Sequence, residues 1–145
     1  MRIRYKLPLV LLVLGISACK TYLIPVASFK QQFAPMRDTA LRAVRVQGPL
    51  GGITTYHTYP IEWIECVDKK GHLFRLRNSP SVEIRFTDTN HKRTVFYFDR
   101  MRVTDTSVTG SESRILPSIH KTVSLNAVTK IEVQDGKKRY HYVTE

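Results

Sequence analysis

Residues 40–145 consist of short runs of β-forming residues separated by turn residues. The runs are rich in Val, Ile, Thr, Tyr and Phe, and Gly, Asp, Asn or Pro interrupts them at intervals of roughly ten residues, as in all-β proteins. No stretch keeps the apolar period of a helix for three turns. The sequence therefore predicts one small antiparallel β domain, a sandwich or a partly open barrel built from hairpins.

Turn residues indicate how the strands follow one another. Asp135-Gly136 between apolar runs is the strongest hairpin signal, because Asp-Gly suits a two-residue turn. A further strand is expected at 121–125, followed by a single helical turn from Asn126 to Thr129. The predicted hairpins pair 41–46 with 53–59, 61–67 with 72–77, 82–87 with 92–98, 101–104 with 107–110, and 131–134 with 138–143.

One strand region changes the parity of its apolar positions. Phe96 and Phe98 are in phase with each other, whereas Met101 and Val103 are out of phase with them. One extra residue near Asp99 would bring all four side chains onto one face of the sheet. We therefore expect a bulge or bend at Asp99-Arg100.

A short sequence pattern occurs twice in the chain, and we call its two copies the echo segments. Residues 61–68 and 128–135 share the pattern apolar-x-x-Ile-Glu-x-x-Asp at a constant offset of 67 residues. Two related β units, about 40–78 and 100–143, would explain it, and so would convergent hairpin sequences. In either case about 105 residues suffice to close one core, so we expect a single domain.

The first 18 residues have the order of a secretory signal peptide. Arg2, Arg4 and Lys6 precede an apolar run at 7–16, and the small residues Ser17 and Ala18 follow it. The run is about half the length of the roughly 20 residues that cross a bilayer. An exported chain is expected rather than a membrane-spanning one.

Residues 16–19, Ile-Ser-Ala-Cys, resemble the lipobox of bacterial lipoproteins. The resemblance implies that Cys19 receives a diacylglyceryl group, that the chain is cleaved before it, and that the new amino terminus is acylated. Several acyl chains would anchor the protein firmly in a bilayer. An ordinary signal peptide with a cysteine nearby is the alternative.

The residues after Cys19 indicate which membrane the protein is anchored in. Lys20 stands where an aspartate would resemble the inner-membrane retention signal of many Gram-negative lipoproteins, so the outer membrane is favoured, on its periplasmic or its outer face. Residues 19–39 are expected to form a lipidated tether. Within it, the spacing of Phe29 and Phe33 places both rings on one face of a short helix or turn that either docks on the domain or lies free.

The chain is basic, with 23 Lys and Arg against 12 Asp and Glu. Cleavage would remove three of the bases and leave 20 against 12, a net charge of +8. An exported protein with this charge meets anionic headgroups and acidic glycans rather than nucleic acid. With Cys19 lipidated, Cys66 has no partner, so no intrachain disulfide is expected.

Basic residues cluster beside aromatic ones in two places, where they are candidates for binding an anionic ligand. The alternative is that these cations protect edge strands from pairing with other chains. The candidate residues are Lys92, Arg93, Arg100, Arg102, Lys137, Lys138 and Arg139.

No metal or cofactor site is expected. Cys66 has no second thiol nearby, and no two histidines have the spacing of metal ligands. The histidines are His57, His72, His91, His120 and His141.

Catalysis by a pair of carboxylates is the enzymatic hypothesis. Glu65 and Glu132 occupy equivalent positions in the two echo segments. The two carboxylates, or one of them with a histidine, would serve a small envelope hydrolase as general acid and base. Solvated or ion-paired glutamates are the simpler interpretation. Trp63, the only tryptophan, is either an exposed platform for a sugar or a filler at the edge of the core.

Several segments together resemble small uncharacterised lipoproteins of Gram-negative bacteria. They are Asp68-Lys69-Lys70-Gly71, the stretch 78–87, Phe96-Tyr97-Phe98-Asp99 and the stretch 130–138. The resemblance implies a lipidated Cys19 and carries no activity or further site residue. The expectation is a membrane-anchored, non-catalytic binding or interaction module whose partners are the bilayer and either an envelope protein or an anionic surface ligand.

Overall fold

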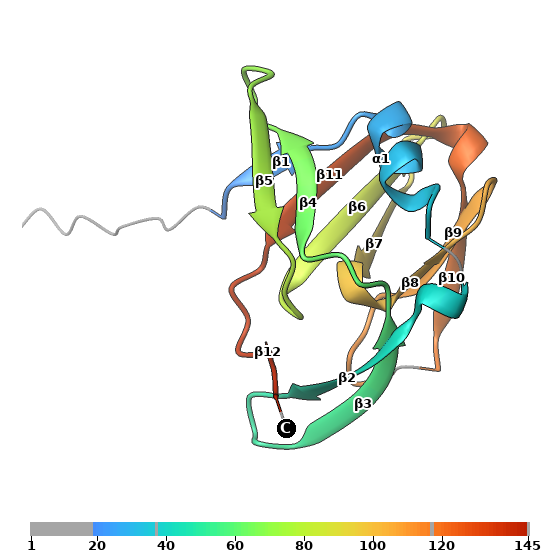
Figure 1. Ribbon diagram of the computed structural model, residues 1–145. Coiled ribbons are helices and arrows are strands. Elements are labelled where there is room, and N and C mark those ends of the chain that lie inside the picture. Colours follow the sequence, from blue (N-terminus) through green and yellow to red (C-terminus); the bar gives the residue numbers. More distant parts are fainter. Residues whose placement is uncertain (1–18, 37, 117, 145) are drawn as a thin grey trace, which may run out of the picture.

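The protein is an all-β structure of three antiparallel sheets, none closed into a barrel (Figure 1). The computed structural model describes residues 19–36, 38–116 and 118–144. The predicted all-β class is confirmed, in the form of a sandwich. The expected signal peptide, residues 1–18, lies outside the described residues. Within them, no helix is long and apolar enough to cross a bilayer.

The largest sheet has six strands and supplies one wall of the core. On β6, Val82, Ile84 and Phe86 are buried and the side chains between them are partly exposed, as the alternating sequence predicts. In spatial order the strands are β5 (Leu73–Arg77), β4 (Trp63–Val67), β1 (Thr21–Leu23), β11 (Val128–Asp135), β6 (Val82–Asp88) and β7 (Arg93–Tyr97).

A second sheet consists of β10 (His120–Ser124), β9 (Ser107–Ser111) and β8 (Met101–Val103). It packs closely on the first, because a Cβ added to Gly110 of β9 would lie 2.7 Å from the ring of Phe96. The 3-10 helix η2 (Phe98–Arg100) joins β7 to β8. This turn is the expected bend, and it allows Phe96, Phe98 and Met101 all to be buried.

The third sheet contains β12 (His141–Tyr142), β2 (Arg42–Gln47) and β3 (Ile53–Thr58). The predicted hairpin of β2 and β3 is confirmed. The hairpin predicted at Asp135-Gly136 is wrong. Because β1 and β6 occupy both edges of β11, the chain leaves the sheet, Gly136 donates its N–H to the carbonyl of Ser81, and β12 pairs with β2 instead.

Residues expected to form a tether are instead part of the domain. β1 lies in the middle of the large sheet, between β4 and β11. Helix α1 (Val26–Phe33) then buries Phe29 and Phe33, and the Phe29 ring meets the Phe86 ring edge-on at 5.5 Å. Docking is favoured because burying the two rings removes their large apolar surface from water.

Two further 3-10 helices complete the described elements, η1 (Asp38–Ala40) and η3 (Leu125–Ala127). The second corresponds to the single helical turn expected after the strand at 121–125, and it begins one residue earlier than expected.

The two echo segments lie in the same sheet. β4 and β11 flank β1, with Leu23 opposite both Val67 and Glu132. The strands of each proposed repeat unit are divided among different sheets, and most of the buried apolar side chains form one continuous core. The two proposed units therefore share two of the three sheets.

Candidate functional site

The seven basic residues expected to bind an anion do not form one patch. Lys92 and Arg93 lie at the β6–β7 turn, beside Asp88. Lys137 and Arg139 follow the end of β11, which pairs with the opposite end of β6. The two groups therefore lie at opposite ends of the large sheet (Figure 1).

Other members of that set are used inside the molecule. The guanidinium of Arg100 lies 4.7 Å from the centre of the Tyr56 ring. Arg102 donates hydrogen bonds to the carbonyls of Met101, at 2.8 Å, and His57, at 3.1 Å. Arg100 and Arg102 thus hold the β2–β3 hairpin against the rest of the domain.

The two candidate catalytic carboxylates are not brought together. β1 separates their strands, so the Cα atoms of Glu65 and Glu132 lie at least about 10 Å apart, which is two strand spacings. Glu132 lies 2.9 Å from the Nζ of Lys130 and 3.6 Å from a guanidinium nitrogen of Arg85. The hydrogen bond from Lys130 lowers the pKa of Glu132, which favours an ionised, paired group over a proton donor.

The most buried charged pair is one that sequence reasoning missed. Arg114, in the loop before β10, donates to Asp99 of η2 at 2.8 Å, and the two side chains are 5% and 0% exposed. Tyr56 of β3 also donates to Asp99, and so does Tyr142 of β12, at 3.0 Å. We call this group, with the two tyrosines, the Asp99 cluster. No local sequence motif predicts it, because its members come from four distant segments.

Aromatic rings close the Asp99 cluster. The Arg114 guanidinium lies 4.1 Å from the centre of the Tyr97 ring and 5.0 Å from that of Tyr140, and it also donates to the carbonyl of Pro80. Burial, followed by the charge of Asp99, raises the pKa of Tyr56, so this hydroxyl stays protonated and donates. The arrangement ties three sheets together and has the properties of a structural contact.

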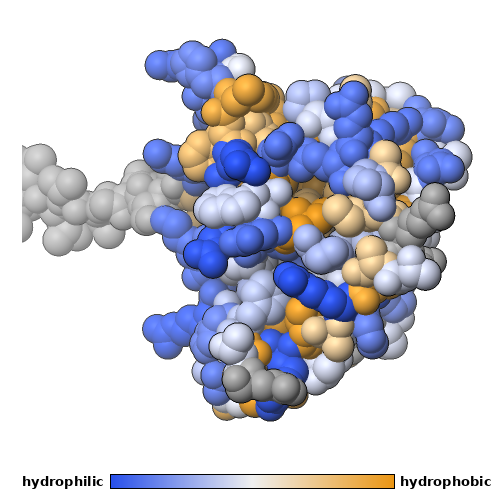
Figure 2. Space-filling model, in the orientation of Figure 1, coloured by the Kyte–Doolittle hydropathy of each residue, from blue (hydrophilic) through white to orange (hydrophobic). Residues whose placement is uncertain are grey.

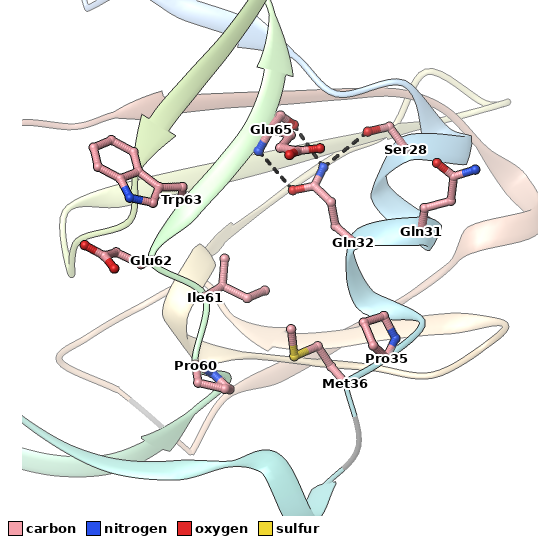
Figure 3. Close-up of a pocket in the computed structure, with 10 residues that line it drawn as sticks. All are labelled: Ser28, Gln31, Gln32, Pro35, Met36, Pro60, Ile61, Glu62, Trp63 and Glu65. Atoms are coloured by element: carbon pink, nitrogen blue, oxygen red, sulfur yellow. Dashed lines mark hydrogen bonds between the residues drawn. The ribbon is translucent and has the colours of Figure 1, made fainter.

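A groove of about 410 Å³ runs between α1 and β4 (Figure 3). At its upper end the Gln32 side chain donates to the carbonyl of Glu65 at 2.9 Å and accepts from the Glu65 N–H at 3.0 Å. β1 pairs with β4 only at Val67, so the Gln32 amide takes the place of the next strand residue.

Apolar and polar side chains share the walls of this groove. Pro35 and Met36 face Pro60 and Ile61 across its lower part, and Figure 3 shows the ring of Trp63 directed away from α1. Trp63 is 42% exposed, with the Arg77 guanidinium 5.9 Å from its ring centre, so the core-filler interpretation does not describe it. Within the described ranges, no three His, Cys, Asp or Glu side chains are grouped as metal ligands.

A second hollow, of about 520 Å³, lies beside Cys19. Cys19 is exposed, and only Lys20 separates it from β1. The β4–β5 turn forms the other side, and Asp68 shapes this turn by accepting from the N–H groups of Lys70 and His72. The hydrogen bond from the His72 backbone lowers the pKa of Asp68.

No family model, curated protein or solved structure matches this chain.

Proposed function

We propose that this protein is an envelope lipoprotein, anchored through an acylated Cys19, whose β domain is a binding or interaction module rather than an enzyme. The position of Cys19 supports the proposal most directly. Cys19 is exposed and lies two residues from Thr21, the first residue of a central strand. Two residues span at most about 7 Å, so a lipid at Cys19 would hold the domain at the bilayer surface.

Binding is favoured over catalysis by the state of the charged groups. Glu132 is ion-paired, and the Asp99 cluster is closed by aromatic rings. The groove beside α1 is lined by apolar and amide side chains, with the exposed indole of Trp63 at its outer edge, and such a mixture suits recognition of a partner in the envelope.

Metabolic labelling with an alkyne analogue of palmitate tests the anchor. The wild-type chain, Cys19→Ser and Cys66→Ala are compared, since Cys66 is the only other cysteine and is buried. We expect label in the wild-type and Cys66→Ala proteins and none in Cys19→Ser. Label on Cys19→Ser equal to that of the wild type would overturn the proposed anchor.

Separation of inner from outer membranes on a density gradient tests the proposed membrane. The wild-type protein is expected in the outer-membrane fraction, and Lys20→Asp is expected to move toward the inner membrane. Lys20→Gln is the matched control, because it removes the same charge without introducing an aspartate. Equal distribution of all three proteins would contradict sorting by this position.

A further inference from the structure

Basic side chains from three separate segments lie on the side of the molecule that carries Cys19. β4 and β11 both run antiparallel to β1, so the turn after β4 and the segment after β11 both lie toward the start of β1. Lys20 lies beside Lys69 and Lys70 of the β4–β5 turn. Lys137 and Arg139, after β11, lie farther along the same side of the molecule. We call these five residues the anchor-end cations. In Figure 1 the three segments lie on the left side of the view.

The anchor-end cations are available to a ligand. All five are exposed, and none forms an ion pair with another residue of the part that the structure describes. Nearby carboxylates have other partners, since Asp68 binds its own turn and His72, and Glu83 binds Lys138. Lys20, Lys69 and Lys70 also border the same hollow as Cys19.

Exposed apolar side chains accompany these charges. Leu73, directly after the β4–β5 turn, is 89% exposed. Phe74 is partly exposed and stacks on the ring of Tyr22 of β1, with 4.3 Å between the ring centres. Figure 2 shows hydrophilic groups at several points along this margin with an apolar area beside the upper one. Aromatic and basic side chains together suit the interface between a bilayer and water.

We propose that this end is a membrane-contact surface, where the anchor-end cations bind the phosphates of anionic lipids around the acyl anchor. The inference rests on the proposed anchoring for its geometry. The span of about 7 Å from Cys19 to β1 is within the Debye length of about 8 Å at physiological salt, so headgroup charges act on Lys20 with little screening. The domain is then held in one orientation, with Lys92 and Arg93 directed away from the bilayer.

Lysine footprinting on vesicles tests this orientation. Full-length protein purified from membranes is reconstituted into vesicles of phosphatidylcholine alone or of equal parts phosphatidylcholine and phosphatidylglycerol. An amine-reactive reagent is added, and peptide mass spectrometry measures each lysine. We expect Lys20, Lys69, Lys70 and Lys137 to react about fivefold more slowly on the anionic vesicles, and Lys92 and Lys121 to be unchanged.

The same digest separates failure of this inference from failure of the anchor, because it also gives the mass of the Cys19 peptide. Selective protection with an unmodified Cys19 would support the contact surface and overturn the anchor. An acylated Cys19 with equal reactivity at both ends would overturn the contact surface and leave the anchor standing. Protection that persists at high salt would also contradict an electrostatic contact.

A charge-matched pair of variants sharpens the result. Lys69→Gln/Lys70→Gln/Lys137→Gln should return Lys20 to the reactivity it has on phosphatidylcholine. Lys30→Gln/Lys92→Gln/Arg93→Gln removes three charges elsewhere and should leave Lys20 protected. Equal behaviour of the two triple variants would show that net charge, rather than this end of the molecule, is responsible.

Discussion

The Asp99 cluster and the anchor-end cations are two assemblies of charge built in opposite ways. Both combine side chains that are distant in the sequence. In the Asp99 cluster the ion pair is buried and every partner is internal. The anchor-end cations are exposed and have no internal ion pair among the described residues. Removing one partner of a buried ion pair destabilises the fold, whereas exposed charges without partners are available to a ligand.

Asp99→Ala tests the buried side of this comparison and should have the largest effect. It leaves the Arg114 guanidinium buried without its counter-charge, so the free energy of unfolding should fall by about 3–5 kcal/mol. Urea denaturation followed by circular dichroism measures the change. Asp68→Ala is the control, because Asp68 also lies close to a basic group, His72 at 3.2 Å, but at the surface.

Asp68→Ala should lower the urea midpoint far less than Asp99→Ala. Equal decreases in the two variants would contradict the view that burial makes the Asp99 pair important for stability. Asp99→Ala combined with Arg114→Met removes both charges. Because the buried cation is then absent, the double variant should be more stable than Asp99→Ala alone.

Tyr56→Phe should have an intermediate effect. It removes a hydrogen bond donated to a buried carboxylate, which is worth about 1.5–3 kcal/mol, and the bond that the Tyr56 hydroxyl accepts from Arg114 at 3.0 Å. Tyr142 and Arg114 still donate to Asp99. Urea denaturation at neutral pH measures the loss. Tyr22→Phe is the matched control, since within the described ranges the Tyr22 hydroxyl has no hydrogen bond to another side chain, and its ring stacks on Phe74. An equal loss in both variants would mean that the Asp99 cluster adds little.

Alkaline pH should weaken the Asp99 cluster selectively. Burial and Asp99 raise the pKa of Tyr56, so the folded protein keeps this proton at a pH where the unfolded chain releases it. Its contribution is complete below about pH 10, the ordinary tyrosine pKa, and falls by up to about 1.4 kcal/mol per pH unit above it. Unfolding free energies from pH 8 to 11 should converge for the wild type and Tyr56→Phe. Parallel curves would contradict this assignment.

Lys69→Gln/Lys70→Gln/Lys137→Gln should have the smallest effect on stability. These side chains are exposed and have no ion pair to lose, so the free energy of unfolding should stay within about 0.5 kcal/mol of the wild type. Thermal denaturation in detergent measures it. A loss as large as that of Tyr56→Phe would mean that the anchor-end cations stabilise the fold, and the contrast between the two assemblies would fail.

The positions of most strands and turns could be predicted from the sequence alone. Alternation of apolar residues from Val82 to Phe86, the turn residues at Asp68–Gly71 and the parity change near Asp99 all describe neighbours in the chain. The backbone and its nearest side chains determine such features, so they can be read without knowing the rest of the structure. Both Cys19 and the overall basic charge also come from the sequence.

Tertiary structure alone decided which segments became neighbours. Asp135-Gly136 has the chemistry of a hairpin turn, yet β1 and β6 had already filled both edges of β11. The segment expected to be a tether placed β1 inside the sheet, and that placement put Lys69 and Lys70 beside Cys19 and the chain after β11 on the same side. Asp99 and Arg114 met only because four distant segments converge. The physical reason is that a strand edge can pair with many other strands, and a charged side chain with many opposite charges, about equally well. Which of these partners is chosen depends on how the whole chain buries its apolar side chains.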